Sequence, residues 1–145
     1  MAMARKIGTW SLLAILVLAF TSAAYARVQR FGDIEANVPP GWTVEEAEGE
    51  LIFFAPDYSA SLVIVIAEES GTTAGAIAAE MSQMFNGSTP ESSDGMYSFE
   101  FRTAEGVDGY VLVFLVEGTD IYMVWSVIGD HPDMITLLDS IQWVD

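Results

Sequence analysis

The clearest pattern in the chain is an alternation of apolar and polar side chains across residues 31–38. Ile34, Ala36 and Val38 fall on one side of an extended chain, and the polar residues between them fall on the other. This alternation predicts a strand with one face in water. The Pro39-Pro40-Gly41 sequence that follows cannot continue the strand and ends it.

Further segments along the chain have the character of strands. Residues 62–66 are apolar and mostly β-branched, which predicts a central strand covered on both faces. The apolar run at 110–116 is also expected to be central, because it would promote aggregation at an edge. Short connections, including a loop at 105–109 and a two-residue turn at 118–119, predict antiparallel pairing. The predicted strands after the first are 43–47, 51–55, 61–67, 96–103, 110–117 and 121–128.

A helix is predicted between the early and the late strands. Thr72 or Thr73 is suited to cap its start, and Gly87 is suited to close its end. Gly75 and several alanines make this helix thin enough to lie close to a sheet. The polar stretch 86–95 that follows is expected to be a loop. The apolar face of the helix combines positions i, i+4, i+7 and i+8, namely Ile77, Met81, Met84 and Phe85.

A second helix is predicted near the end of the chain. It is expected to start within residues 130–133, with Pro132 in its first turn. Trp143 follows it and is expected to dock on the edge of the sheet. The apolar residues of this helix also recur at helical spacing: Met134, Leu137, Leu138 and Ile141.

These elements follow one another in the order β-β-β-β-α-β-β-β-α. The fold class predicted from this order is α+β, with an antiparallel sheet of about six to seven strands packed with two helices. Neither an internal repeat nor a linker is visible in the sequence. Residues 27–145 are therefore expected to form a single domain.

Residues 1–26 have the organisation of an export signal. Arg5 and Lys6 precede an apolar stretch of about 14 residues, which is short for the roughly 20 that span a bilayer. The Ala24-Tyr25-Ala26 sequence then matches a cleavage site, so we expect cleavage after Ala26 and a periplasmic or secreted protein of a bacterium. The alternative is an uncleaved membrane anchor.

Composition excludes several classes of function. The whole chain has a formal charge of −16, and cleavage after Ala26 would leave three arginines against 21 acidic residues, a charge of −18. Such acidity argues against nucleic-acid binding, which needs a basic face. The chain has no Cys and one His, so it offers neither a disulfide framework nor a thiol nucleophile, and a metal centre built from several histidines is impossible within one chain.

The layout of residues 31–143 resembles the PsbP-like superfamily, which includes the periplasmic DcrB-like proteins. The features that carry this resemblance are the first strand, the Pro39-Pro40-Gly41-Trp42 turn, the strand ending at Ala55-Pro56-Asp57, the apolar strand at 62–67, and the closing hairpin and helix. The resemblance implies an α/β/α sandwich around an antiparallel sheet. Functions in that superfamily include association with photosynthetic membranes, binding of small GTPases and chaperoning of secreted effectors. It has no shared catalytic motif to transfer.

Catalytic chemistry has few candidates in this sequence. His131, within Asp130-His131-Pro132-Asp133, could act as a base or a metal ligand, but the same residues suit the start of a helix. A G-x-S-x-G elbow is lacking. The carboxylate pairs fall at predicted turns and strand ends, where solvated charge is expected. These pairs are Glu45 with Glu46, Glu48 with Glu50, Glu68 with Glu69, Glu91 with Asp94, and Glu117 with Asp120. We therefore expect no enzyme, no cofactor and no catalytic residues.

Binding chemistry leaves more alternatives open. A loose calcium site near Glu45–Glu50 is one, because calcium takes oxygen ligands, although the loop pattern of an EF-hand is absent. Asn86-Gly87-Ser88 reads as a glycosylation sequon, which occurs by chance in a bacterium. Met81 and Met84 read most simply as core residues. Trp42, Trp125 and Trp143 could form an aromatic binding surface, although packing is the simpler role for them.

The first hypothesis is therefore an exported non-enzymatic binding or accessory protein of the cell envelope. Its acidic surface would engage a protein partner that presents a basic surface. The second hypothesis is a calcium- or small-ligand-binding periplasmic module. The third is an envelope enzyme that uses His131 or a carboxylate pair.

Overall fold

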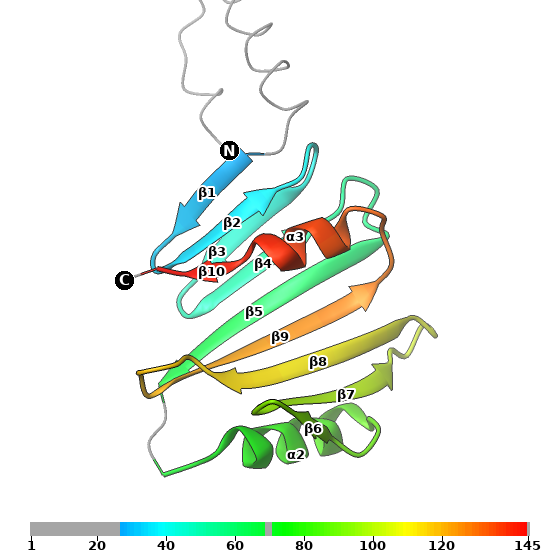
Figure 1. The fold of residues 1–145 in the computed structure, drawn as a ribbon. Helices are drawn as coiled ribbons and strands as arrows, with labels where there is room; N and C mark the ends of the chain where they lie inside the picture. The colour runs from blue at the N-terminus through cyan, green and yellow to red at the C-terminus, as the bar shows by residue number, and fades with distance from the viewer. Residues whose placement is uncertain (1–26, 69–70, 145) are drawn as a thin grey trace, which may run out of the picture. The chain divides into compact units, whose positions relative to one another are not determined.

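The computed structural model describes residues 27–68 and 71–144 (Figure 1). The export signal and its cleavage after Ala26 lie outside these residues. These described residues fall into two compact units, the first made of residues 27–43 together with 132–144, and the second of the described residues between 44 and 131. The single-domain organisation of residues 27–145 stays a prediction.

The smaller unit is a three-stranded antiparallel sheet with one helix. Its strands lie in the order β1 (Arg27–Phe31), β2 (Ile34–Val38) and β10 (Gln142–Trp143), and its helix is α3 (Met134–Ser140). Trp143 pairs with Ile34, which confirms that the end of the chain docks on a sheet edge. The Ser140 hydroxyl ties α3 to β2, because it accepts the Asn37 N–H at 2.8 Å and donates to the Leu137 carbonyl at 2.7 Å.

The larger sheet has seven strands in the order β3-β4-β5-β9-β8-β7-β6. The strand pairings from β4 across to β6 are all antiparallel, and Figure 1 shows the strands following one another in this order. The central positions of β5 and β8 confirm the prediction made from their apolar runs. The strands are β3 (Thr43–Ala47), β4 (Glu50–Phe54), β5 (Ala60–Glu68), β6 (Glu91–Ser93), β7 (Met96–Arg102), β8 (Asp108–Leu115) and β9 (Ile121–Gly129).

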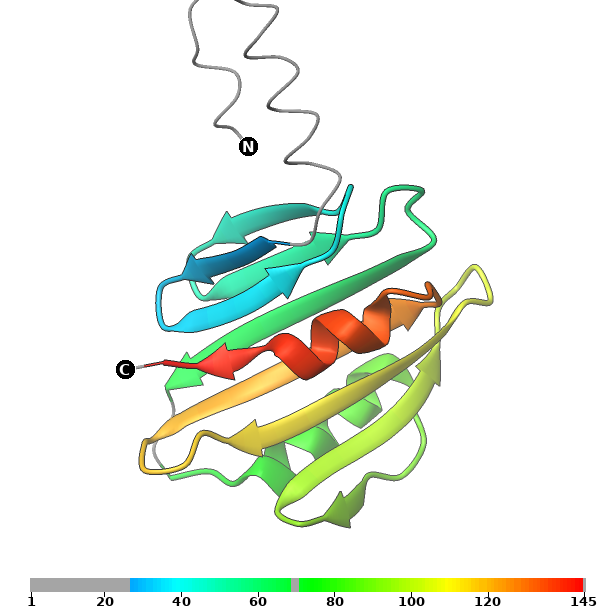
Figure 2. The ribbon, with the colours of Figure 1, turned by 45° about the horizontal axis from the view of Figure 1, so that its top comes forward.

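Helix α2 (Ala74–Phe85) packs on one face of this sheet, against β7 and β8 (Figure 2). Thr73 caps its start as predicted, since the Thr73 hydroxyl accepts the Ala76 N–H at 3.0 Å. The helix lies close to the sheet, because a Cβ added at Gly75 would meet the Tyr97 ring at 3.0 Å. The buried core between α2 and the sheet consists of Ala74 and Ala78 of the helix and of Phe99, Val111, Val113, Tyr122 and Val124 of the strands.

The α+β antiparallel class with two helices is thus confirmed, but several boundaries differ from the prediction. The predicted strand 31–38 is two strands, because Gly32 adopts φ +63° and turns the chain between β1 and β2. The predicted loop 86–95 contains the short strand β6. The first, second and last strands form a second sheet in place of one continuous sheet.

The turn between β8 and β9 is also displaced. It is centred on Glu117 and Gly118, because the Thr119 N–H donates to the Val116 carbonyl at 3.1 Å and Gly118 adopts φ +78°. Val116 then bonds Ile121, so the connection is longer than the predicted two-residue turn at 118–119.

The second helix starts where it was predicted, directly after residues 130–133, but the roles predicted for Gly87 and Pro132 need correction. Asn86, and not Gly87, takes the left-handed conformation that ends α2, with φ 57° and ψ 40°. Gly87 instead donates its N–H to the Ser82 carbonyl at 2.8 Å. At the other helix, Asp133 is the N-cap of α3, so Pro132 precedes the helix and does not lie in its first turn.

The apolar face of α2 differs from the face predicted by periodicity. Met84 is 70% exposed, so it is not a core residue. The residues of α2 that are buried are Ala74, Ala78 and Ser82, because small side chains let the helix approach the sheet. Ile77, Met81 and Phe85 flank this buried line and pack against the core as partly buried residues.

Strand β5 is covered differently on its two faces. Leu62 and Ile64 are fully buried, as expected for a central strand. Val63 and Val65, on the face that carries α2, are only partly buried. The prediction that both faces of this strand are covered is therefore wrong for the second face, because α2 lies over β7 and β8 and not over β5.

Candidate functional site

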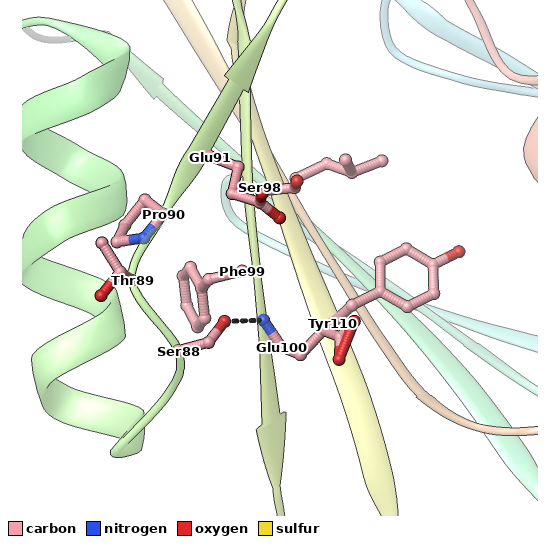
Figure 3. A pocket seen from close by; sticks show the side chains of 9 residues that line it. Ser88, Thr89, Pro90, Glu91, Ser98, Phe99, Glu100 and Tyr110 are labelled. Carbon is pink, nitrogen blue, oxygen red and sulfur yellow. Dashed lines mark hydrogen bonds between the residues drawn. The ribbon is translucent and has the colours of Figure 1, made fainter.

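The principal candidate site is a pocket of about 730 Å³ at the outer strands of the larger sheet (Figure 3). One wall is the segment 88–91, which leads from α2 into β6. The floor is made by β7 and β8, where Glu100 pairs with Tyr110 and Ser98 pairs with Leu112. These four side chains share one face because cross-strand partners point to the same side of a sheet.

Ser88 fixes the position of the pocket wall. Its N–H donates to the Glu100 carbonyl at 2.8 Å, and its hydroxyl accepts the Glu100 N–H at 2.9 Å, the bond drawn in Figure 3. The Ser82 hydroxyl of α2 donates to the Ser88 carbonyl at 2.6 Å. The wall is therefore tied both to α2 and to β7, and Thr89, Pro90 and Glu91 of the same segment also line the pocket.

The pocket carries negative charge from two glutamates. Glu91 and Glu100 line it, and both residues are exposed. Among the described residues, the ion pairs within 4.0 Å join Arg30 to Asp33 and Arg102 to Asp108, so neither glutamate belongs to one. Two carboxylates at one concave surface attract cations, and a protonated Lys or Arg side chain can donate hydrogen bonds to them.

Tyr110 gives the pocket an aromatic side. Burial raises the pKa of its phenol, so the hydroxyl stays protonated throughout the physiological range and can donate a hydrogen bond. The ring also presents a π-face, which favours contact with a cationic group. His131 is not among the residues that line this pocket, and the exposed carboxylates and the Tyr110 hydroxyl are groups that can recognise a cationic ligand.

The sequence identified only part of this pocket. It singled out Glu91 as a member of a carboxylate pair with Asp94, but not Glu100 or Tyr110. The alternation along 96–103 places Ser98 and Glu100 on the polar side of the strand, which was the available signal. What the sequence lacked was the register that brings Tyr110 opposite Glu100 and the wall 88–91 beside them.

The charge of His131 acts on Asp57, and Asp57 accepts hydrogen bonds from Ser59. The Ser59 hydroxyl donates to Asp57 Oδ1 at 2.7 Å, so its proton goes to the carboxylate and not to the imidazole. The Ser59 side chain and N–H both donate to Asp57, and these bonds lower the pKa of its carboxyl, with a smaller contribution from the charge of His131. The cluster therefore stabilises the turn that precedes β5.

The acidic segment Glu45–Glu50 does not form a metal site in the described structure. Glu45, Glu46 and Glu48 are exposed, while Glu50 is partly buried. Within residues 27–68 and 71–144, no group of three His, Asp or Glu side chains is placed to hold a metal ion. The calcium alternative therefore gains no support from the geometry.

The tryptophans lie in packed positions, and the acceptor of the sequon lies at the end of a helix. Trp42 is buried, and Trp125 packs edge-to-face on Phe114, with ring centroids 5.4 Å apart. Trp143 is partly buried in β10. Asn86, the acceptor of the sequon, is the C-cap of α2. In the part of the chain that the structure describes, no helix is long and apolar enough to cross a membrane.

Comparison with known proteins shows the fold and no closer relationship. No protein family and no curated protein sequence matches the chain. A mutant form of the protein Mog1 superposes with a TM-score of 0.54 and 10% identity, over 83% of this chain and 96% of that one. The Saccharomyces cerevisiae Ran-binding protein Mog1p gives a TM-score of 0.52 and 10% identity, over 83% of this chain and 97% of that one.

At 10% identity these likenesses concern the fold alone. They agree with the PsbP-like resemblance at the level of the α+β fold, because the chain shares its element arrangement with Mog1 over nearly the whole of that protein. The narrower likeness to DcrB-like proteins stays a prediction. This chain therefore has a PsbP- and Mog1-like fold, and its function has to be argued from its own surface.

Proposed function

We propose that this protein is an exported, non-enzymatic binding or accessory protein of the bacterial cell envelope, and that it engages a protein partner through its acidic surface. The observation that carries this proposal is the pocket lined by Glu91, Glu100 and Tyr110, in which neither glutamate belongs to an ion pair of the described arginines. The partner should present a basic side chain, Lys or Arg, to this pocket.

The charge of the whole protein supports the same conclusion. Three arginines stand against 21 acidic residues once residues 1–26 are removed, so basic surfaces are attracted from a distance and acidic ones are repelled. The fold adds support of a weaker kind. One protein that shares it, Mog1p, is a Ran-binding protein, so the fold is compatible with recognition of another protein.

The location in the envelope rests on the export signal. Expression of the full chain in a bacterium should yield a product that begins at Arg27 and partitions with the periplasmic fraction or the medium. Intact N-terminal sequence in the cytoplasmic fraction would contradict this part of the proposal.

Binding is tested with two fluorescent peptides that differ only in charge, one carrying two Lys residues and one carrying the acetylated forms. The protein purified from the exported fraction is titrated by fluorescence anisotropy at low and at high salt. We expect the Lys peptide to bind more tightly, and its affinity to fall as salt shortens the Debye length to about 8 Å and below.

A matched pair of double variants separates the pocket from general electrostatics. Glu91→Gln with Glu100→Gln removes two charges at the pocket, and Glu117→Gln with Asp120→Asn removes two charges at the β8–β9 turn. The proposal expects the first pair to abolish the preference for the Lys peptide and the second pair to keep it. An equal loss in both would show that only net charge matters.

A further inference from the structure

A second cavity lies on the opposite side of the larger sheet, on the face that carries α2. Because α2 packs over β7 and β8, the neighbouring strands β4, β5 and β9 are left without a helix above them in this unit. A groove of about 490 Å³ runs along this uncovered strip. This volume lies within the range of about 300–1,000 Å³ that small-molecule sites occupy.

The interior of this groove is apolar. Val63 and Val65 of β5 and Ile128 of β9 form its floor, and all three are only partly buried. One wall is a ridge of α2 at i and i+4, made by Met81 and Phe85. An apolar body that covers these partly exposed side chains removes their surface from water, and this burial favours binding.

The wall is fixed in shape by aromatic contacts. The Phe85 ring packs on the Phe101 ring, with centroids 5.0 Å apart and planes at 57°, and Phe85 also meets Phe99 edge-to-face at 6.1 Å. Phe99 is buried in the core. The groove is therefore a preformed surface supported by the packed interior, which lowers the entropic cost of binding.

Two charged residues line the groove, and only one of them is neutralised by a partner. Arg102 Nε and Nη2 each lie 2.9 Å from Asp108 Oδ1, so this guanidinium already has its counter-charge. Glu50 lines the groove as well and belongs to neither of the ion pairs found among the described residues. The charge that the groove offers to a ligand is therefore negative.

From this combination we infer that the groove binds a small amphiphile with a protonated amine at one end and an apolar body. The ammonium group meets the Glu50 carboxylate, and the body lies over Val63 and Val65 toward Phe85. An uncharged apolar chain can bury its surface in the groove but cannot form an ion pair with Glu50. The charge of an anionic amphiphile is repelled by the Glu50 carboxylate. Arg102 does not compensate for this repulsion, because its guanidinium is already paired with Asp108.

This site is independent of the proposed partner-binding pocket. The two cavities share no lining residue, and they use side chains of different character. Failure of peptide binding at Glu91 and Glu100 would leave the groove untouched, and the reverse also holds.

Three probes with the same eight-carbon chain test the inference: octylammonium, octanol and octanoate, each below its micelle concentration. The full exported protein is titrated at pH 7 by calorimetry, with amide chemical shifts recorded in parallel. We expect octylammonium to bind about fivefold more tightly than octanol, the factor expected of a partly exposed ion pair. Octanoate should be the weakest, and shifts should concentrate in β4, β5, β9 and α2.

Variants assign the head and the body of the ligand separately. Glu50→Gln should remove the advantage of octylammonium over octanol and leave octanol unchanged, whereas Glu48→Gln, a substitution of an exposed glutamate outside the groove, should keep that advantage. Val63→Thr places a hydroxyl on the floor and should weaken all three probes by about threefold. If Val63→Thr fails to fold, Glu50→Gln alone decides.

Three results would overturn the inference. One is an amine advantage that survives Glu50→Gln or disappears equally in Glu48→Gln. Another is a set of amide shifts centred on the pocket of Glu91 and Glu100. The third is the absence of saturable binding by any of the three probes.

Discussion

The Ser88 hydroxyl accepts the backbone N–H of Glu100 at 2.9 Å, and the Ser88 N–H donates to the Glu100 carbonyl at 2.8 Å. Ser88, in the connection after α2, thus forms hydrogen bonds with both the backbone N–H and the carbonyl of Glu100 in β7. The segment that forms the pocket wall is therefore held as if it were a further strand residue, although β6 itself begins only at Glu91.

Replacing Ser88 with alanine should loosen the pocket wall. The Glu100 N–H would lose its acceptor, and we expect the free energy of unfolding to fall by about 1 kcal/mol, the usual net value of one such bond. Urea unfolding of Ser88→Ala measures this change. Ser92→Ala, in the exposed strand β6, is the matched control and should change stability by less.

The start of α2 depends on a single side chain. Thr73 accepts the Ala76 N–H at 3.0 Å, and its removal in Thr73→Ala should cost about 1 kcal/mol of stability. Thr73→Ser keeps the hydroxyl and should retain most of the stability. Thermal unfolding of both variants tests the cap, and an equal loss in Thr73→Ser would assign the effect to the lost methyl group.

Gly87 is required because β7 leaves no room for a side chain there. A Cβ at this position would lie 2.6 Å from Phe99 Cδ1 and 2.9 Å from the Glu100 carbonyl oxygen. Gly87→Ala should therefore destabilise the protein by about 1–3 kcal/mol, the range for overpacking.

A double-mutant cycle identifies the cause of that loss. If the clash with the Phe99 ring dominates, the cost of Gly87→Ala should shrink in a Phe99→Leu background, which removes the ring. A cost that stays the same in both backgrounds would assign the effect to the Glu100 carbonyl instead.

Acid should destabilise the protein partly through Asp57. Hydrogen bonds from Ser59 hold the pKa of this carboxyl below its usual value of 3.8, so the folded state favours the ionised form. The resulting stability is present above the usual pKa and is lost as pH falls through the lower, folded pKa. Chemical unfolding between pH 2 and pH 5 should show a shallower decline in Asp57→Asn and in Ser59→Ala. An unchanged slope in Ser59→Ala would contradict the role of its hydroxyl.

Alkali should act through Tyr110. Burial raises the pKa of its phenol above the usual value of 10.0, so the folded state holds the proton more tightly than the unfolded state does. Stability is then retained below that usual value and lost as pH rises toward the folded pKa. Tyr110→Phe should flatten this alkaline decline in denaturant unfolding at pH 9–11, and a decline as steep as in the parent protein would remove Tyr110 as its cause.

Periodicity in the sequence was sufficient for much of this fold. Alternation at 31–38 and 96–103, the apolar runs at 62–66 and 110–116, and the spacing around Thr73 are local signals that dictate strands and a capped helix. Net charge and the lack of Cys also follow from counting alone, because neither depends on the path of the chain. These signals give the class and the central strands correctly.

The exposure of Met84, the pocket and the groove were decided only by the tertiary structure, because each depends on segments that are distant in the sequence. Met84 belongs to the apolar periodicity of α2, yet it is exposed, because the sheet beneath α2 requires Ala78 and Ser82 at the contact. The pocket exists because strand register places Tyr110 opposite Glu100 and because Ser88 bonds across to β7. The groove exists because α2 covers β7 and β8 and leaves Val63 uncovered. Such relations join residues far apart in the chain, so no local pattern in the sequence specifies them.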